Sequence, residues 1–310
     1  MTVIFILLLL LALLVLTSYI CFRMAFYVSD KAKIVPPYSM PDGDIYIPYH
    51  DQMREWMRET YALPCEEISV QSFDGLTLYG RFYEYAPDAP IELMLHGYRG
   101  SAERDLCGGV QRCFSLKRSV LLVDLRASGR SGGNVISFGI NERHDCLTWA
   151  NYLAERFPDR KLILTGISMG AATVMMASAM DLPESVVCVL ADCGYSSAKE
   201  IIMKVIRQMH LPAKPLYPFV KLGAKLFGHF DLEETSPIEA MAACKVPMIF
   251  IHGDADDFVP CEMSRCCHEA CTAPKTILTV PGAGHGMGFL MDHDGYVKTL
   301  REFEKTYFPL

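Results

Sequence analysis

A serine between two glycines is the residue of this chain best placed for covalent chemistry. It stands in the motif GISMG (residues 166–170), after the apolar run KLILT and before the small-residue run AATVMMASA. A serine on a sharp turn between a strand and a helix exposes its hydroxyl, and bulk two positions before or after it would block the turn. The following helix directs its N-terminal N–H groups at the reacting centre. The motif therefore indicates a nucleophilic Ser168, with a structural serine in a tight turn as the alternative.

A serine nucleophile needs a base, and one histidine has a suitable setting. His285 lies in GAGHG (residues 282–286), directly after the last apolar run of the chain. Glycines on both sides leave its imidazole free to project from the loop. Any single histidine can instead be a satisfied surface or core residue, and His96 and His252, each before a glycine at a strand end, fit that alternative better. We expect His285 to take the proton of Ser168.

The base needs an acidic residue to orient it, and three carboxylates crowd one loop. They lie in HGDADDFVP (residues 252–260), after the penultimate apolar run. Turn and helix-cap hydrogen bonds can occupy two of them, which leaves one for the imidazole. The spacing after His-Gly favours Asp256, with Asp257 second, and Asp192 after the preceding run is a further candidate.

Acyl transfer also requires two backbone N–H groups for the oxyanion. One is expected from the residue after the nucleophile, Met169. The other is expected from the loop HGYRGS (residues 96–101), whose glycines let the backbone turn toward the site, with Tyr98 as the donor. A site of this kind needs no metal ion and no organic cofactor.

The elements that must position these residues follow from the apolar pattern. Two alternating segments around an Asp74-Gly75 turn predict a hairpin over residues 66–85. Continuous apolar runs then alternate with helical stretches, which is typical of a mostly parallel sheet with helices on both faces. The further strands are predicted at 91–97, 119–126, 161–168, 186–193, 246–254 and 276–284, and the main helices at 101–116, 141–157, 168–180, 261–273 and 294–307.

One stretch interrupts this alternation. Residues 195–235 are too long for a single connection between a strand and a helix, and they carry a helical period. They predict a helical cap inserted into the domain. The cap residues Met203, Met209, Leu211 and Phe219 could line an acyl pocket, although a stripe of this kind more often packs a cap on its core.

The N-terminus carries a different signal. Residues 2–22 contain no charge and would span about 31 Å as a helix, which matches the hydrocarbon core of a bilayer. No Lys or Arg precedes this run and no small-x-small site follows it, so an uncleaved anchor over residues 1–23 is favoured over a signal peptide. A Pro-rich linker with a short helix (24–65) and a catalytic domain (66–310) follow. Arg23, Lys31 and Lys33 favour a cytoplasmic catalytic domain.

Charge and cysteine usage exclude or weaken other functions. The net charge is −7 and no Lys/Arg block stands out, so a nucleic-acid partner is not expected. Loop residues Arg99, Arg126 and Arg130 could bind an anionic group, although solvated loop charges are more common. Four cysteines and His268 cluster within 261–271, but without C-x-x-C spacing packing is favoured over a metal site. The twelve cysteines fit a reducing compartment.

The chain order Ser168, Asp256, His285, together with the glycine elbow and the HGYRGS and HGDADDFVP loops, resembles the α/β-hydrolase superfamily. Within it, the chain is similar to bacterial membrane-anchored serine hydrolases of the serine aminopeptidase-like and lysophospholipase-like branch. The resemblance covers about residues 66–308, and DLRASGRSGG (residues 124–133) matches the family's loop after the next strand. It implies an eight-stranded core, a cap after the sixth strand and esterase-type chemistry.

We therefore expect a membrane-tethered serine hydrolase that cleaves an acyl ester, a thioester or a small amide through an acyl-enzyme. Its substrate would be a small acyl compound, with lipids among the candidates. Two alternatives stay open. The same triad serves an aminopeptidase-like peptidase, and the fold also serves as a non-catalytic ligand-binding scaffold, against which the complete triad argues.

Overall fold

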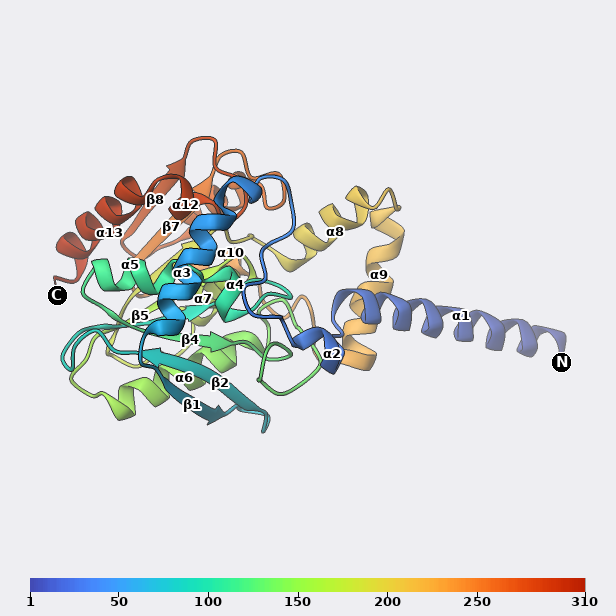
Figure 1. The fold of residues 1–310 in the computed structure, drawn as a ribbon. Helices are drawn as coiled ribbons and strands as arrows, with labels where there is room; N and C mark the ends of the chain where they lie inside the picture. The colour runs from blue at the N-terminus through green and yellow to red at the C-terminus, as the bar shows by residue number, and fades with distance from the viewer. Residues whose placement is uncertain (310) are drawn as a thin grey trace.

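A single mixed sheet forms the centre of the protein, as a computed structural model of residues 1–309 describes it. The strand order is β1-β2-β4-β3-β5-β6-β7-β8 (Figure 1). β2 pairs antiparallel with β1 and β4, and all other neighbours are parallel, which confirms the expected α/β-hydrolase fold. The strands are β1 Glu66–Gln71, β2 Thr77–Tyr83, β3 Ile91–Leu95, β4 Ser119–Asp124, β5 Leu162–Ile167, β6 Val186–Asp192, β7 Met248–Gly253 and β8 Lys275–Val280.

Helices cover both faces of the sheet because its parallel strands are apolar on both. In β3, Leu93 and Leu95 join the hydrophobic cluster on one face, whereas Met94 joins the cluster on the other. The first face is covered by α6 Glu142–Arg156, α7 Met169–Ala177, α10 Pro237–Met241 and α11 Cys261–Ala270. The second face is covered by α4 Ala102–Asp105, α5 Gly109–Ser115, α12 Gly288–Met291 and α13 His293–Tyr307.

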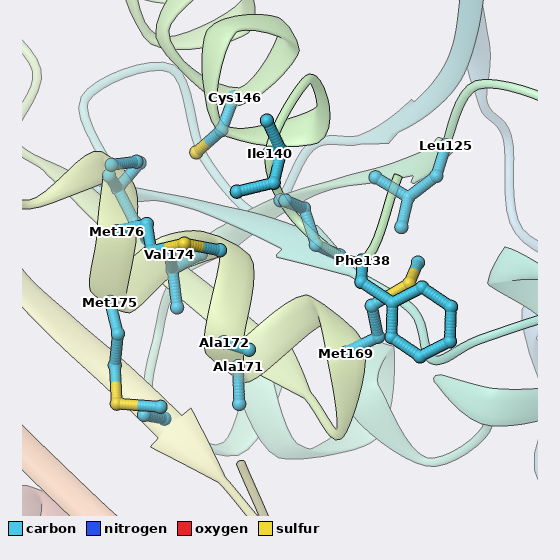
Figure 2. Close-up of a cluster of buried hydrophobic side chains, with 14 of the residues drawn as sticks. Leu125, Phe138, Ile140, Cys146, Met169, Ala171, Ala172, Val174, Met175 and Met176 are labelled. Carbon is cyan, nitrogen blue, oxygen red and sulfur yellow. The ribbon is translucent and has the colours of Figure 1, made fainter. Parts of the chain in front are cut away.

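The helix that leaves the serine motif, α7, is buried along its whole length. A helix that is apolar on every side lies either inside a protein core or in a membrane, and α7 lies in the core. Its small residues Ala171 and Ala172 allow a close approach to the sheet, and Met175 and Met176 fill the wider spaces beyond them. Figure 2 shows these side chains within the main core, with Cys146 of α6 nearby.

The predicted helix over residues 101–116 is wrong as a single element, because it forms two short helices, α4 and α5. The break lies at Gly108, whose φ of +82° is rarely adopted by residues with a side chain. A Cβ atom at this position would lie 2.6 Å from the Trp56 ring of α3 (His50–Ala62). The chain therefore breaks where α3 docks on this face of the domain.

The N-terminal helix α1 (Thr2–Ala25) has an exposed half and a docked half. The large apolar residues of positions 3–16 are exposed, while Ser18 and Phe22 are buried. The contact is close because Gly223 of α9 (Ala213–Gly223) faces Ser18, whose carbonyl oxygen would lie 2.4 Å from a Cβ there. α1 is long and apolar enough to cross a membrane, so it is a candidate anchor or signal sequence.

The segment after α1 contributes to the domain core. Phe26 is fully buried and makes edge-to-face contacts with Phe138 and Phe230. The Val28 N–H donates a 2.8 Å hydrogen bond to the Asn134 carbonyl oxygen. Two short elements then lead to α3, namely α2 Asp30–Lys33 and the 3-10 turn η1 Ile47–Tyr49. The division into anchor (1–23), linker (24–65) and catalytic domain (66–310) stays a prediction.

The insertion between β6 and β7 is helical, which confirms the predicted cap. It contains α8 Ala198–Gln208, α9, and the π-helical turn η2 Ala224–Gly228. Figure 1 shows α8 and α9 as an arm on the side of the domain from which α1 projects, with α9 crossing α1 near its C-terminal end.

Replacing Phe26 by Ala tests whether the residues after α1 belong to the folding unit. Loss of this buried ring should lower the free energy of unfolding by about 3 kcal/mol, because it leaves a cavity between two other aromatic rings. The measurement is thermal and chemical unfolding in detergent. Phe5→Ala is the matched control, because Phe5 is the same residue type and is exposed on α1. Equal stability of the two variants would contradict the prediction.

Candidate active site

Three loops far apart in the sequence meet at one edge of the sheet. Ser168 follows β5, Asp256 follows β7 and His285 follows β8, and parallel strands direct their carboxyl ends to a common edge. The His285 Nε2 atom lies 2.9 Å from the Ser168 Oγ atom, and the His285 Nδ1 atom lies 2.7 Å from the Asp256 Oδ2 atom. The structure thus brings together all three residues that the motifs selected.

The backbone at Ser168 is strained, with φ +57° and ψ −117°. Two glycines make this geometry accessible. A Cβ atom on Gly166 would lie 2.1 Å from the Gly170 carbonyl, and one on Gly170 would lie 2.2 Å from the Leu95 carbonyl oxygen of β3. Neither position can carry a side chain while the turn stays closed, so the two glycines hold the Ser168 hydroxyl above the strand ends.

Asp256 is buried and accepts four hydrogen bonds. The donors are the ring nitrogens of His252 and His285 and the backbone N–H groups of Phe258 and Val259. Burial raises the pKa of this carboxyl, but the hydrogen bonds from the two histidines outweigh burial, so the pKa lies well below its usual range. The carboxylate is therefore ionised at neutral pH and directed at the imidazole.

The other two acidic candidates do not reach the imidazole. Asp257 is exposed on the surface of the same loop. Asp192 is buried and accepts a 2.8 Å hydrogen bond from the Tyr296 hydroxyl. Burial raises the pKa of Asp192. The hydrogen bond from Tyr296 lowers it, but by less, so the pKa of Asp192 is raised. The two buried carboxyls next to the site thus differ in environment: the pKa of Asp256 is lowered and that of Asp192 is raised.

His252 has a closer connection to the site than its strand-end position suggests. Its Nε2 atom lies 3.1 Å from the Asp256 Oδ2 atom and 2.9 Å from the Val259 carbonyl oxygen, while its Nδ1 atom lies 2.7 Å from the Ser264 hydroxyl. The buried ring therefore holds Asp256 from the side opposite His285. The sequence carries no signal for this bond, because a histidine before a glycine also fits an ordinary turn. His96 instead accepts from the Leu125 N–H.

The loop expected to supply an oxyanion donor lies against the nucleophile. A Cβ atom on Gly97 would be 3.8 Å from the Ser168 Oγ atom. The Asp105 carboxylate accepts a 3.1 Å hydrogen bond from the Gly97 N–H and holds the loop in place. Among residues 1–309, no group accepts a hydrogen bond from the backbone N–H of Tyr98 or of Met169. Both amides are therefore free to bind an oxyanion.

Two cavities of different character meet at the nucleophile. The first, of about 290 Å³, is partly polar and contains Ser168 and His285 with Arg104, Asp105, Asp192 and Tyr296 in its wall. The second, of about 330 Å³, is almost wholly apolar and is lined mainly by the cap helices, including Ile201, Ile202, Val205, Ile206, Met209 and Leu211. Ser168 therefore lies at a boundary between a polar and an apolar space.

A metal ion fits this site poorly. Cys193, Asp256 and His285 bring ligand atoms within 4.8 Å of one another. However, both ring nitrogens of His285 are already engaged, one with Asp256 and one with Ser168. Burial raises the pKa of the Cys193 thiol well above its usual value, whereas a metal ion requires the thiolate. The donor set suits a hydrogen-bonded triad better than a metal centre.

The loop arginines and the cysteine cluster lie away from both cavities. Arg126 is buried in ion pairs with Asp74 and Asp145, and Arg130 pairs with Glu67 at the surface. Arg99 donates to backbone carbonyls at the end of α1. In the cysteine cluster, Cys267 and Cys271 are buried in the main core, where a thiol packs as a small apolar group.

Fold and site together define the class. A mostly parallel eight-stranded sheet with a serine on a strand–turn–helix elbow, followed along the chain by an aspartate and a histidine, is a hydrolase of the α/β-hydrolase fold. The sequence profile of the prolyl oligopeptidase family matches residues 136–308, which is more than half of the chain. The chain belongs to the prolyl oligopeptidase family.

Individual proteins are also similar to this chain. The uncharacterised protein YqkD of Bacillus subtilis strain 168 is 29% identical over 245 residues, covering 77% of this chain and 80% of its own. An esterase of Pyrococcus furiosus superposes with a TM-score of 0.66 at 21% identity, over 89% of this chain and 98% of its own. The acylaminoacyl peptidase of Pyrococcus horikoshii superposes with a TM-score of 0.56 at 16% identity, over 81% of this chain and 43% of its own. The two structural likenesses show the fold.

Replacing Asp256 by Asn should lower the free energy of unfolding at pH 7 by about 1–3 kcal/mol, because buried donors lose their charged acceptor. The pKa of Asp256 is lowered in the folded state, so its contribution is present above the usual value of 3.8 and is lost as the pH falls. The stability gap between wild type and Asp256→Asn should therefore narrow below about pH 4.

Denaturant titrations in detergent between pH 7 and about pH 2 measure this gap. Asp257→Asn is the matched control, because the Asp257 carboxylate is exposed. Its free energy of unfolding should equal that of the wild type at every pH. A gap for Asp256→Asn that stays constant over this range would contradict the prediction.

Proposed function

We propose that the protein is a serine hydrolase that cleaves acyl esters through an acyl-enzyme. The observation that carries this proposal is the hydrogen-bonded chain from the Ser168 hydroxyl through His285 to Asp256, at 2.9 and 2.7 Å. These are distances at which a base can remove a hydroxyl proton without rearrangement. The strained, glycine-flanked backbone of Ser168 gives the hydroxyl the exposure that a nucleophile needs.

The mechanism follows from the position of each group. As the Ser168 Oγ atom attacks the acyl carbonyl carbon, His285 Nε2 accepts its proton and Asp256 stabilises the imidazolium that forms. The backbone N–H groups of Met169 and Tyr98 bind the oxyanion. His285 then protonates the leaving alcohol, and the acyl group stays on Ser168. A water molecule, deprotonated by His285, attacks the acyl-enzyme and releases the acid.

The two cavities support an ester that joins an apolar acyl group to a polar alcohol. The apolar cavity suits a hydrocarbon acyl group, because its wall offers almost no hydrogen-bonding partner. The polar cavity suits the alcohol, since Arg104, Asp105 and Tyr296 can contact hydroxyl or other polar groups there. Thioesters and small amides remain substrates of the same chemistry. A peptidase is the second candidate function, favoured by the match to the prolyl oligopeptidase family.

We propose further that α1 is an uncleaved single-pass anchor with the catalytic domain on the cytoplasmic side. The burial of Ser18 and Phe22 supports retention of the helix, because cleavage after it would remove side chains from the domain. Arg23, Lys31 and Lys33 follow the span and favour a cytoplasmic position. All twelve cysteines among residues 1–309 are free thiols, which fits a reducing compartment. The proposed partners are thus an acyl substrate, lipid included, and the membrane, with no nucleic acid.

Activity-based labelling tests the nucleophile. Wild-type protein should react with a fluorophosphonate probe and hydrolyse p-nitrophenyl butyrate, and Ser168→Ala should abolish labelling and lower kcat/KM at least 10³-fold. Asp257→Asn is the control and should behave as wild type. Labelling that survives Ser168→Ala would contradict the proposal, and absence of labelling in the wild type would favour a binding scaffold. Faster turnover of alanine p-nitroanilide than of every ester in a chain-length series would instead establish the peptidase.

Cysteine labelling tests the orientation of the anchor. Cys65 is exposed directly before the catalytic domain, so a membrane-impermeant maleimide should modify it in lysed cells and leave it unmodified in intact spheroplasts. A Thr2→Cys variant, at the opposite end of α1, should be modified in intact spheroplasts. Mass spectrometry of the peptides quantifies both sites. Modification of Cys65 in intact spheroplasts would reverse the proposed topology.

A further inference from the structure

The apolar cavity beside Ser168 has a wall that comes from outside the hydrolase fold. Cys21, Met24 and Ala25 of α1 line it on one side, and residues of α8 and α9 line it on the other. Ser168 and Met169 lie in the same lining. A continuous apolar space therefore extends from the nucleophile to the end of the N-terminal helix.

The loop beside the nucleophile holds the end of α1 in this position. The last carbonyl groups of a helix have no donor within the helix. The Arg99 guanidinium donates to the carbonyl oxygen of Met24, in the last turn of α1, at 2.9 Å and to that of Tyr27, just after the helix, at 3.1 Å. The Tyr98 hydroxyl donates to the carbonyl oxygen of Ala25 at 2.8 Å. Tyr98 and Arg99 belong to the loop that lies against Ser168. The helix end, the cavity wall and the oxyanion loop thus form one packed unit.

The length of α1 places the cap at the membrane surface. Its freely exposed stretch, residues 3–16, rises about 21 Å, whereas a bilayer core is about 30 Å thick. To cross that core, the helix must be immersed to about residue 22, and residues 18 and 22 are already packed against the domain. Figure 1 shows α9 and the turn between α8 and α9 on this same side. Lipid must therefore reach the cap.

The α8–α9 turn has the composition expected of a surface in contact with lipid. Met209 and Leu211 are 47% and 43% exposed, although both are large and apolar, and both also line the cavity. The exposed basic residues Arg207 and Lys214 flank them and suit the headgroup region. The same side chains thus form the wall of the cavity and face the outside.

We propose that the acyl chain of a membrane lipid ester passes directly from the bilayer to Ser168 through this cavity, between the end of α1 and the α8–α9 turn. The inference rests on the proposed serine hydrolase chemistry and on α1 as an anchor. Ser168 forms the acyl bond, the lipid's alcohol leaves with the proton from His285, and water releases the fatty acid. The alcohol stays in the polar cavity, away from the membrane core.

Substitutions in the wall test this path in the full-length protein in phosphatidylcholine vesicles. The measured quantity is the ratio of kcat/KM for p-nitrophenyl palmitate, dissolved in the bilayer, to that for p-nitrophenyl acetate in solution. Cys21→Trp fills the cavity from α1, and Met209→Asp places a charge in the α8–α9 turn. Each should lower the ratio at least 10-fold. Ile20→Trp is the matched control and should leave the ratio of kcat/KM values unchanged, because Ile20 is exposed on α1 outside the cavity.

An unchanged ratio in both Cys21→Trp and Met209→Asp would overturn the inference while leaving the proposed function intact. Absence of acetate hydrolysis and of fluorophosphonate labelling in the wild-type protein would instead overturn the proposed function. The two failures are therefore distinguishable in one set of measurements.

Discussion

The close approach of the serine turn to the end of β3 is the constraint on which the rest of the structure depends. Gly166 and Gly170 have backbone atoms where a Cβ would have to lie, so the turn closes only without side chains there. Closure holds Ser168 at a positive φ, a strain of about 1–3 kcal/mol, which the burial of all of α7 offsets. The same contact sets the loop after β3 against the Ser168 hydroxyl.

The pKa values of two carboxyls close to Ser168 are shifted in opposite directions. Asp256 receives hydrogen bonds from two imidazoles and two backbone amides, which keep it ionised despite its burial. Asp192 receives one from the Tyr296 hydroxyl, and burial prevails there and raises its pKa. Two aspartates thus have pKa values shifted in opposite directions by their surroundings, and the lowered pKa of Asp256 suits a partner of an imidazolium.

The N-terminal helix, the candidate membrane anchor, also contributes to the surroundings of the site. Its last carbonyls are capped by the loop that lies against Ser168, and its last turns complete the apolar cavity. The aromatic contacts of Phe26 extend this connection into the core of the domain. With α1 as the proposed anchor, this arrangement would direct the apolar side of the site toward the lipid phase.

The sequence by itself determined the parts that depend on local patterns. Alternating segments and apolar runs predicted all eight strands, and the spacing within GISMG and GAGHG selected Ser168 and His285. These features depend on neighbouring residues, which determine strand burial and turn geometry. Only the tertiary structure decided which carboxyl reaches the imidazole, that His252 supports it, and that Trp56 interrupts a predicted helix at Gly108. It also joined α1 to the cavity. Each of these depends on contacts between segments distant in sequence, and periodicity reports that a residue is buried without reporting what lies against it.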